Sequence, residues 1–143
     1  MIPARGAEIL HASCVALDGR GLLILGPSGS GKSALALQLM AYGAQLVADD
    51  RTEIAREGDA LMARCPPAIS GLIEARGMGI LRAPPLSQAA VVLVVDLGRM
   101  ETDRLPQRRV ITMLGLPIDL VLATQNDHFG SALCCYLRGG RQE

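Results

Sequence analysis

The sequence predicts an α/β fold, and three observations support this. Residues 26–33 read Gly-Pro-Ser-Gly-Ser-Gly-Lys-Ser and have an apolar run on each side, the pattern of a strand that enters a phosphate-binding turn and then a helix. Residues 89–95 form a continuous apolar run, which is typical of a strand buried on both faces. Elsewhere, short strand-like segments meet at turns that favour hairpins. The fold is therefore α/β, with more hairpins than a plain alternating βαβ array.

The first half of the chain supplies most of these elements. Residues 8–17 and 21–25 read as two strands joined by the turn Asp-Gly-Arg at 18–20. A helix is expected over 33–42, because Gly43 is suited to end it. Residues 45–48 read as the next strand, and 52–56 and 60–64 as a second hairpin around Glu-Gly-Asp.

The second half is less regular. Residues 72–80 alternate charge with glycine, and the pattern alone leaves an ordinary loop and a functional segment equally open. The buried strand at 89–95 follows, and residues 131–137 read as a short C-terminal helix. We expect one domain over residues 1–143, a length sufficient to bury a real core.

Composition excludes several classes of protein. The chain has 14 basic and 14 acidic residues, so no long-range field attracts nucleic acid or an anionic membrane. Its apolar runs are too short to span a bilayer, and residues 1–6 lack the apolar stretch of a secretion signal. The sequence thus predicts a cytoplasmic protein that binds neither nucleic acid nor membrane.

The four cysteines suggest neither a metal site nor a disulfide framework. They contain no Cys-x-x-Cys pair, and neither histidine stands at zinc-finger spacing from them. We expect buried, reduced thiols that behave as small apolar side chains. The cysteines are Cys14, Cys65, Cys134 and Cys135.

Residues 26–33 carry the clearest chemistry. Their glycines let backbone N–H groups point at phosphate oxygens, and the following helix adds its positive N-terminal end. Lys32 is expected at the β- and γ-phosphates, and Ser33 at Mg²⁺. A glycine-rich turn with a chance lysine is the weaker alternative. The predicted nucleotide-binding residues are Gly26, Pro27, Ser28, Gly29, Ser30, Gly31, Lys32 and Ser33.

Acidic residues follow two of the predicted strands. Asp49 and Asp50 end the strand after the helix, and paired carboxylates there suit metal binding and proton abstraction from a hydroxyl. An exposed acidic turn is the alternative. Asp96 ends the apolar run at 91–95 as in a Walker B strand, so by pattern alone it competes with Asp49 and Asp50 for a metal ion.

Together these motifs resemble the catalytic domain of HPr kinase/phosphorylase, the bacterial enzyme that phosphorylates a serine of the phosphocarrier protein HPr. The resemblance is collinear over about residues 8–105. It rests on His-Ala-Ser-Cys-Val at 11–15, the P-loop, Leu-Val-Ala-Asp-Asp at 46–50, Ile-Glu-Ala-Arg-Gly-Met-Gly-Ile at 73–80 and Asp-Arg-Leu at 103–105. The Asp-Asp and Glu-x-Arg-Gly-x-Gly-Ile pieces are specific, whereas many families share the P-loop.

The resemblance implies a role for each of these residues. Asp50 takes the proton from the HPr serine, and His11 completes the active site, although a core histidine stays an alternative for His11. Lys32 and Arg104 stabilise charge on the phosphoryl group. Ser33 and Glu74 bind Mg²⁺ with support from Asp49. Asp96 then becomes a structural strand terminus.

The same resemblance implies ATP and Mg²⁺ as cofactors, HPr as partner and a homo-oligomer. It also implies a P-loop on a mixed sheet with flanking helices, the fold shared with phosphoenolpyruvate carboxykinase. The chain is similar to the compact form of alphaproteobacteria, because it begins almost at the catalytic domain. Weak phosphorylase activity is expected, since residues 115–122 lack the arginines of bifunctional members and add Asp119, although Arg108 and Arg109 are candidates to compensate.

Two other functions stay open. A P-loop kinase of small molecules usually has an arginine-rich lid, for which Arg108 and Arg109 are poor candidates. A non-catalytic, ATP-binding regulator is the second. A transporter ATPase is excluded, because the chain has no Leu-Ser-Gly-Gly-Gln-type signature and is too short.

Overall fold

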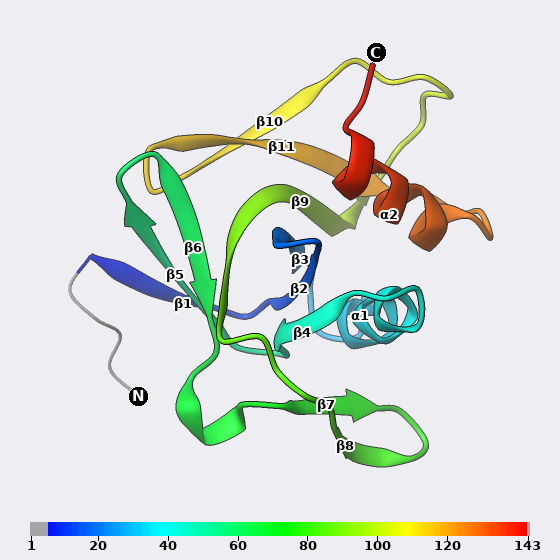
Figure 1. The fold of residues 1–143 in the computed structure, drawn as a ribbon. Coiled ribbons are helices and arrows are strands. Elements are labelled where there is room, and N and C mark those ends of the chain that lie inside the picture. Colours follow the sequence, from blue (N-terminus) through cyan, green and yellow to red (C-terminus); the bar gives the residue numbers. More distant parts are fainter. Residues whose placement is uncertain (1–5, 143) are drawn as a thin grey trace.

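A curled sheet with two helices on its outer side forms most of the molecule (Figure 1). The computed structural model describes residues 6–142. Residues 1–5, on which the expected lack of a secretion signal mainly rests, and residue 143 lie outside the described part. Between these limits the chain has a nine-stranded sheet and a separate two-stranded one.

The elements follow one another in this order along the chain. The large sheet contains β1 (Ala7–Leu10), β2 (Ser13–Leu17), β3 (Arg20–Leu25), β4 (Gln45–Ala48), β5 (Thr52–Glu57), β6 (Ala60–Arg64), β9 (Gln88–Met100), β10 (Arg109–Met113) and β11 (Leu116–Ala123). The small sheet is the hairpin of β7 (Leu72–Ala75) and β8 (Gly79–Arg82). The helices are α1 (Lys32–Ala41), α2 (Phe129–Gly139) and the short 3₁₀ helix η1 (Pro67–Ile69).

The long strand β9 organises the sheet. On one edge it pairs in parallel with β3. On its other edge it pairs first with β6, antiparallel, and then with β11, in parallel. Because β9 has two successive partners on that edge, the sheet branches there, and Figure 1 shows it curling around its inner face.

Strand alternation divides the core into two layers. Leu22 and Ile24 of β3 pack with the helices on the outer face, where Leu39 of α1 and Leu137 of α2 meet them. Leu23, between them, points to the inner layer. These side chains are almost fully buried, and such burial of apolar side chains is the main force that holds both layers together. The P-loop, which directly follows β3, is thus attached to a strand that is buried on both faces.

Most expected elements are confirmed. The α1 helix, the hairpins β2–β3 and β5–β6, the strand β4 and the C-terminal helix lie where the patterns place them. Gly43 ends α1 as expected, at a φ of 108° that side-chain-bearing residues rarely adopt. The buried strand is longer than the apolar run that predicts it.

One expectation needs correction, and the structure decides one alternative that the sequence left open. A single strand over 8–17 is wrong, because the chain changes pairing partner at His11 and Ala12: β1 pairs with β5, whereas β2 pairs with β3 and β4. The segment 72–80 is no ordinary loop but the hairpin β7–β8. The hairpin β10–β11 was not expected at all.

None of the helices in the described residues has the length and apolar character needed to cross a membrane.

Candidate active site

The loop between β3 and α1 has the backbone that phosphate binding needs. Gly31 precedes the first helical residue at a φ of 98°, which a side chain would strain. A Cβ at Gly26 would collide with the buried Ser30 hydroxyl. No acidic residue stands in the first turn of α1, so the positive end of the helix is left for an anion.

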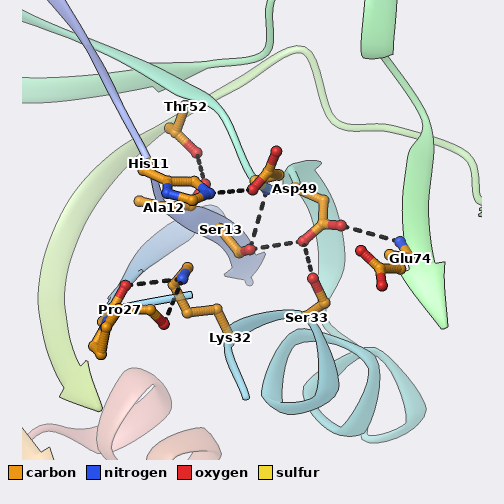
Figure 2. Close-up of polar contacts among 11 residues, drawn as sticks. His11, Ala12, Ser13, Pro27, Lys32, Ser33, Asp49, Thr52 and Glu74 are labelled. Carbon is orange, nitrogen blue, oxygen red and sulfur yellow. Dashed lines mark hydrogen bonds and ion pairs between the residues drawn. The ribbon is translucent and has the colours of Figure 1, made fainter. Parts of the chain in front are cut away.

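Lys32, the only lysine of the chain, lies at the start of α1. Its side chain is largely buried, and its ammonium donates hydrogen bonds to the carbonyls of Gly26 at 2.8 Å and Pro27 at 3.1 Å (Figure 2). These contacts hold the positive charge over the loop that it is expected to serve. Lys32 also lines a cavity of about 540 Å³, called the main cavity from here on.

Asp49 is a buried carboxylate that three donors satisfy. Its Oδ1 accepts from the hydroxyls of Ser33 and Ser13, each at 2.7 Å, and its Oδ2 accepts from the backbone N–H of Glu74 at 3.0 Å (Figure 2). A buried charge without such partners would be costly. The carboxylate therefore ties α1, β2 and β7 together below the P-loop.

Ser13 is a residue that the sequence reasoning missed. Its fully buried hydroxyl donates to Asp49 and also accepts from the backbone N–H of Asp50 at 3.3 Å. It thus contacts both members of the acidic pair. The available signal was a lone hydroxyl residue in an otherwise apolar strand, Ser-Cys-Val-Ala-Leu.

Asp50 and His11 form an exposed pair beside the loop. Asp50 has a φ of 68°, unusual for a residue other than glycine, and this turn separates its carboxylate from that of buried Asp49. Its Oδ1 lies 2.5 Å from Nε2 of His11, and the side chains are 60% and 59% exposed. The alternative of a core histidine is therefore wrong. A carboxylate held this way and open to solvent is suited to accept a proton.

The main cavity gathers most of the predicted site. Lys32, Ser33 and Glu74 line it on one side, and the Asp50–His11 pair lines it as well. Asp49 contributes from below through Ser33. The hairpin β7–β8 adds two residues that sequence reasoning had not assigned, Arg76 and Met78.

Two candidates lie apart from the cavity lining. Arg104 is exposed on the loop between β9 and β10. Asp96 ends the pairing of β9 with β3, and its Oδ1 accepts from the backbone N–H of Gly98 at 2.8 Å. That bond supports a structural role for Asp96. Within the described chain, Arg76 and Lys32 are the cationic side chains that line the cavity.

The donor set fits Mg²⁺. The oxygens of Ser33, Asp49 and Glu74 are hard ligands of the kind that Mg²⁺ prefers. Residues 6–142 hold no group of three or more His, Cys, Asp and Glu side chains placed for a metal ion. This is compatible with Mg²⁺, which usually keeps several waters and binds one or two carboxylates together with substrate phosphates.

Asp119 does not face the cavity. It lies on β11, where its carboxylate accepts a hydrogen bond from the Tyr136 hydroxyl at 2.9 Å. Burial and, after it, this bond raise the pKa of Tyr136, and the bond attaches α2 to the sheet. Asp119 therefore gives no structural support to the expectation of weak phosphorylase activity.

All four cysteines are free, but the expected burial holds only for Cys14 and Cys134, because Cys65 is half-buried and Cys135 is exposed. Burial raises the pKa of Cys14 to about 12. The pKa of Cys65 is raised by burial and by the nearby charge of Asp49. Neither thiol is suited to act as a nucleophile, because the thiolate is the reactive form.

Comparisons with known proteins agree with this geometry. Residues 5–110 match the family model of the HPr Serine kinase C-terminal domain. HPr kinase/phosphorylase of Cupriavidus necator is 40% identical over 124 residues, and that of Ralstonia pickettii is 39% identical over the same length; each alignment covers 78% of this chain. The chain spans 38% of the length of these relatives.

A solved structure is also similar. The Hpr(Ser) kinase/phosphatase from Coxiella burnetii superposes with a TM-score of 0.77 at 26% sequence identity, over 92% of this chain and 94% of that one. This likeness confirms the predicted fold class, an α/β P-loop kinase fold of the phosphoenolpyruvate carboxykinase type.

Proposed function

The chain belongs to the family of the HPr Serine kinase C-terminal domain, and on that premise we propose that it transfers the γ-phosphoryl group of ATP to a serine of HPr. The observation that carries the proposal is the Asp50–His11 pair, because it is exposed and lines the same cavity as Lys32 and Ser33. A phosphate site and a proton acceptor thus share one space.

The proposed reaction has a simple balance. The serine oxygen of the acceptor attacks the γ-phosphorus, the bond to the β,γ-bridging oxygen breaks, and ADP leaves. The serine proton passes to the Asp50 carboxylate, which His11 orients through Nε2. Lys32 and the N-terminus of α1 offset the negative charge that spreads over the phosphoryl oxygens.

Mg²⁺ belongs to this proposal. Ser33 and Glu74 would hold it with support from Asp49, and it would supply positive charge at the β- and γ-phosphates. The protein's own part is visible in the contacts of Asp49, which orient the Ser33 hydroxyl and place Glu74 at the cavity wall.

The homo-oligomer stays a proposal, and the role of Arg104 with it. Three apolar side chains within six positions of Arg104 in the sequence are exposed, namely Met100, Leu105 and Val110. Exposed apolar residues of this kind would form a contact surface if they lay together in the folded chain. Arg104 would act in catalysis only if its loop approached a cavity, its own or that of another subunit.

Weak phosphorylase activity also stays a prediction. The relatives are named as kinase and phosphorylase together. The argument now rests only on the missing arginines, because residues 116–123 form the strand β11 and Asp119 is bonded to Tyr136. From the length and composition of the chain we also propose a cytoplasmic location and a single catalytic unit over residues 1–143.

Incubation with labelled ATP, Mg²⁺ and HPr tests the function. We expect the label on a serine of HPr, and Lys32→Ala should lower transfer by at least about a hundredfold because it removes charge at the phosphates. Arg99→Ala, which removes an exposed cation outside the cavity lining, is the control. If Lys32→Ala transfers label to HPr at the parental rate, the P-loop mechanism is refuted.

The same assay separates the alternatives. A small-molecule kinase would consume ATP without labelling HPr, and a regulator would bind ATP without turnover. Because Lys32 is the only lysine, amine acylation followed by mass spectrometry reports nucleotide binding directly. ATP should protect that single side chain in all three cases, so protection without any ATP turnover identifies a regulator, and turnover without label on HPr identifies a small-molecule kinase.

A further inference from the structure

Two smaller cavities continue the main one past the Asp50–His11 pair. The first, of about 310 Å³, shares His11 and Asp50 with the main cavity and adds Ile9, Leu10 and Arg51. The second, of about 270 Å³, shares Ile9 and Arg51 with the first and ends between Pro66, Ala68 and Ile69. The three spaces therefore adjoin one another along shared wall residues, and we call the two beyond the pair the acceptor groove.

The acceptor groove lies on the opposite side of the pair from the P-loop. Its walls come from the end of β1, from the turn after β4 and from η1. Figure 1 shows β1 and the segment between β6 and β7 on one side of β4, and α1 with the hairpin β7–β8 on the other. A nucleotide in the P-loop would leave the groove open.

The chemistry of the groove changes along its length. Beside the pair it offers the Arg51 guanidinium, which is exposed and has no ion-pair or side-chain hydrogen-bond partner among residues 6–142. Its far end is apolar, since Ile9, Pro66, Ala68 and Ile69 line it with Arg51. That end, of about 270 Å³, lies at the lower limit of the roughly 300–1,000 Å³ of small-molecule sites and has room for one side chain of a protein.

We propose that the acceptor groove binds the segment of HPr that carries the serine to which the phosphoryl group is transferred. One apolar side chain of that segment enters the pocket of Ile9, Pro66, Ala68 and Ile69, and Arg51 bonds a carbonyl or carboxylate of the same segment. The serine hydroxyl then enters the main cavity beside Asp50 and faces the γ-phosphorus from the side opposite the β,γ-bridging oxygen, as in-line transfer requires. This inference rests on the proposed function and deepens it.

Kinetics with HPr as the varied substrate test the groove. Ala68→Phe fills the pocket from an exposed position on η1, and Arg51→Gln removes the free cation. We expect each to raise KM for HPr by about tenfold, the effect of losing roughly 1.4 kcal/mol of binding. The value of kcat at saturating HPr and the affinity for ATP should stay near the parental ones, because neither residue lines the nucleotide cavity.

Matched controls come from the same chain. Ala132→Phe alters an exposed alanine on α2, and Arg99→Gln an exposed arginine at the end of β9; neither residue lines the groove. Both should leave KM for HPr unchanged. Sedimentation of Ala68→Phe checks whether a second copy of the chain occupies the groove instead.

The outcomes separate the two proposals. Parental KM in both groove variants, with normal transfer by the parent, would overturn the groove and leave the kinase function standing. A groove variant that loses ATP affinity as well as having a raised KM for HPr would also overturn it. A changed oligomeric state in Ala68→Phe would do the same. If the parent protein does not phosphorylate HPr at all, the function fails and the groove proposal falls with it.

Discussion

At the scale of single residues, Asp49 and Asp50 are adjacent in the sequence, but one carboxylate is buried and the other is exposed. Asp49 is largely buried and occupied by three donors, whereas Asp50 is exposed and bonds His11. The left-handed backbone at Asp50 makes this division possible, because it turns the two side chains in different directions. Ser13 contacts both residues.

We therefore predict a positioning role for Ser13. Ser13→Ala removes the hydroxyl that holds Asp49 and the Asp50 backbone, so kcat should fall by about tenfold with little change in KM for ATP, a loss of the size expected when a buried hydrogen bond is removed. Ser13→Thr keeps the hydroxyl and should retain activity. Initial rates over a range of ATP concentrations measure both effects.

Thr52→Val is the matched control for Ser13. Thr52 is equally buried, but its hydroxyl donates to the carbonyl of Ala12 and contacts neither acid. Both variants should lose comparable stability on melting. If Thr52→Val lowers kcat as much as Ser13→Ala does, Ser13 has only a general structural role.

Sequence motifs predicted most of the cavity lining. Lys32, Ser33, Glu74, Asp50 and His11 all carry local patterns, and all five line it. The contact of Ser13 with Asp49 joins residues 36 positions apart, and no local pattern reports such a contact. The location of Arg104 could not be predicted from the sequence for the same reason, because it depends on where a loop of the folded chain lies.

At the scale of elements, local signals again separate what could be predicted from what could not. Turn residues and apolar runs located α1, β4 and both early hairpins. The break between β1 and β2 and the hairpin β10–β11 depend on pairing with distant strands. Pairing of this kind is decided by the whole sheet and overrides local preference.

One ion pair closes the loop between β9 and β10. Arg109 donates from Nε and Nη2 to the two carboxylate oxygens of Glu101, at 3.1 and 3.0 Å. The same carboxylate accepts from the backbone N–H groups of Thr102 and Asp103. The bond with Arg109 is the main reason why the pKa of Glu101 is lowered from its ordinary value of 4.5.

This lowered pKa predicts a pH dependence of stability. A carboxylate whose folded pKa is depressed stabilises the protein above its ordinary pKa, and that contribution is lost as pH falls through the folded value. Glu101→Gln should therefore melt at a lower temperature than the parent at neutral pH. The difference should shrink as pH falls from about 5 to about 3.

Thermal melts across this range measure the effect. Glu8→Gln, at an exposed position of β1, is the control and should differ little from the parent at any pH. A difference between Glu101→Gln and the parent that is constant with pH would show that the ion pair contributes nothing through the charge of Glu101.

At the scale of the molecule, the fold places the P-loop and the proposed acceptor groove on either side of the Asp50–His11 pair. The P-loop follows the central strand β3, and Asp50 follows β4 at the edge of the same sheet. Because β2 lies between β3 and β4 and holds Ser13, one rigid sheet determines the distance from phosphate site to base. Small changes in such a distance are costly to the rate of transfer.

The most direct test of this account is single-turnover transfer to HPr by the parent protein and by Asp50→Asn, with ATP affinity measured in parallel. The asparagine keeps the shape of the side chain but cannot accept the serine proton. The rate should fall by about 10²–10⁴-fold, whereas ATP affinity should stay within about threefold because the P-loop is untouched. Transfer by Asp50→Asn at the parental rate would contradict the assignment of Asp50 as the base and the central claim with it.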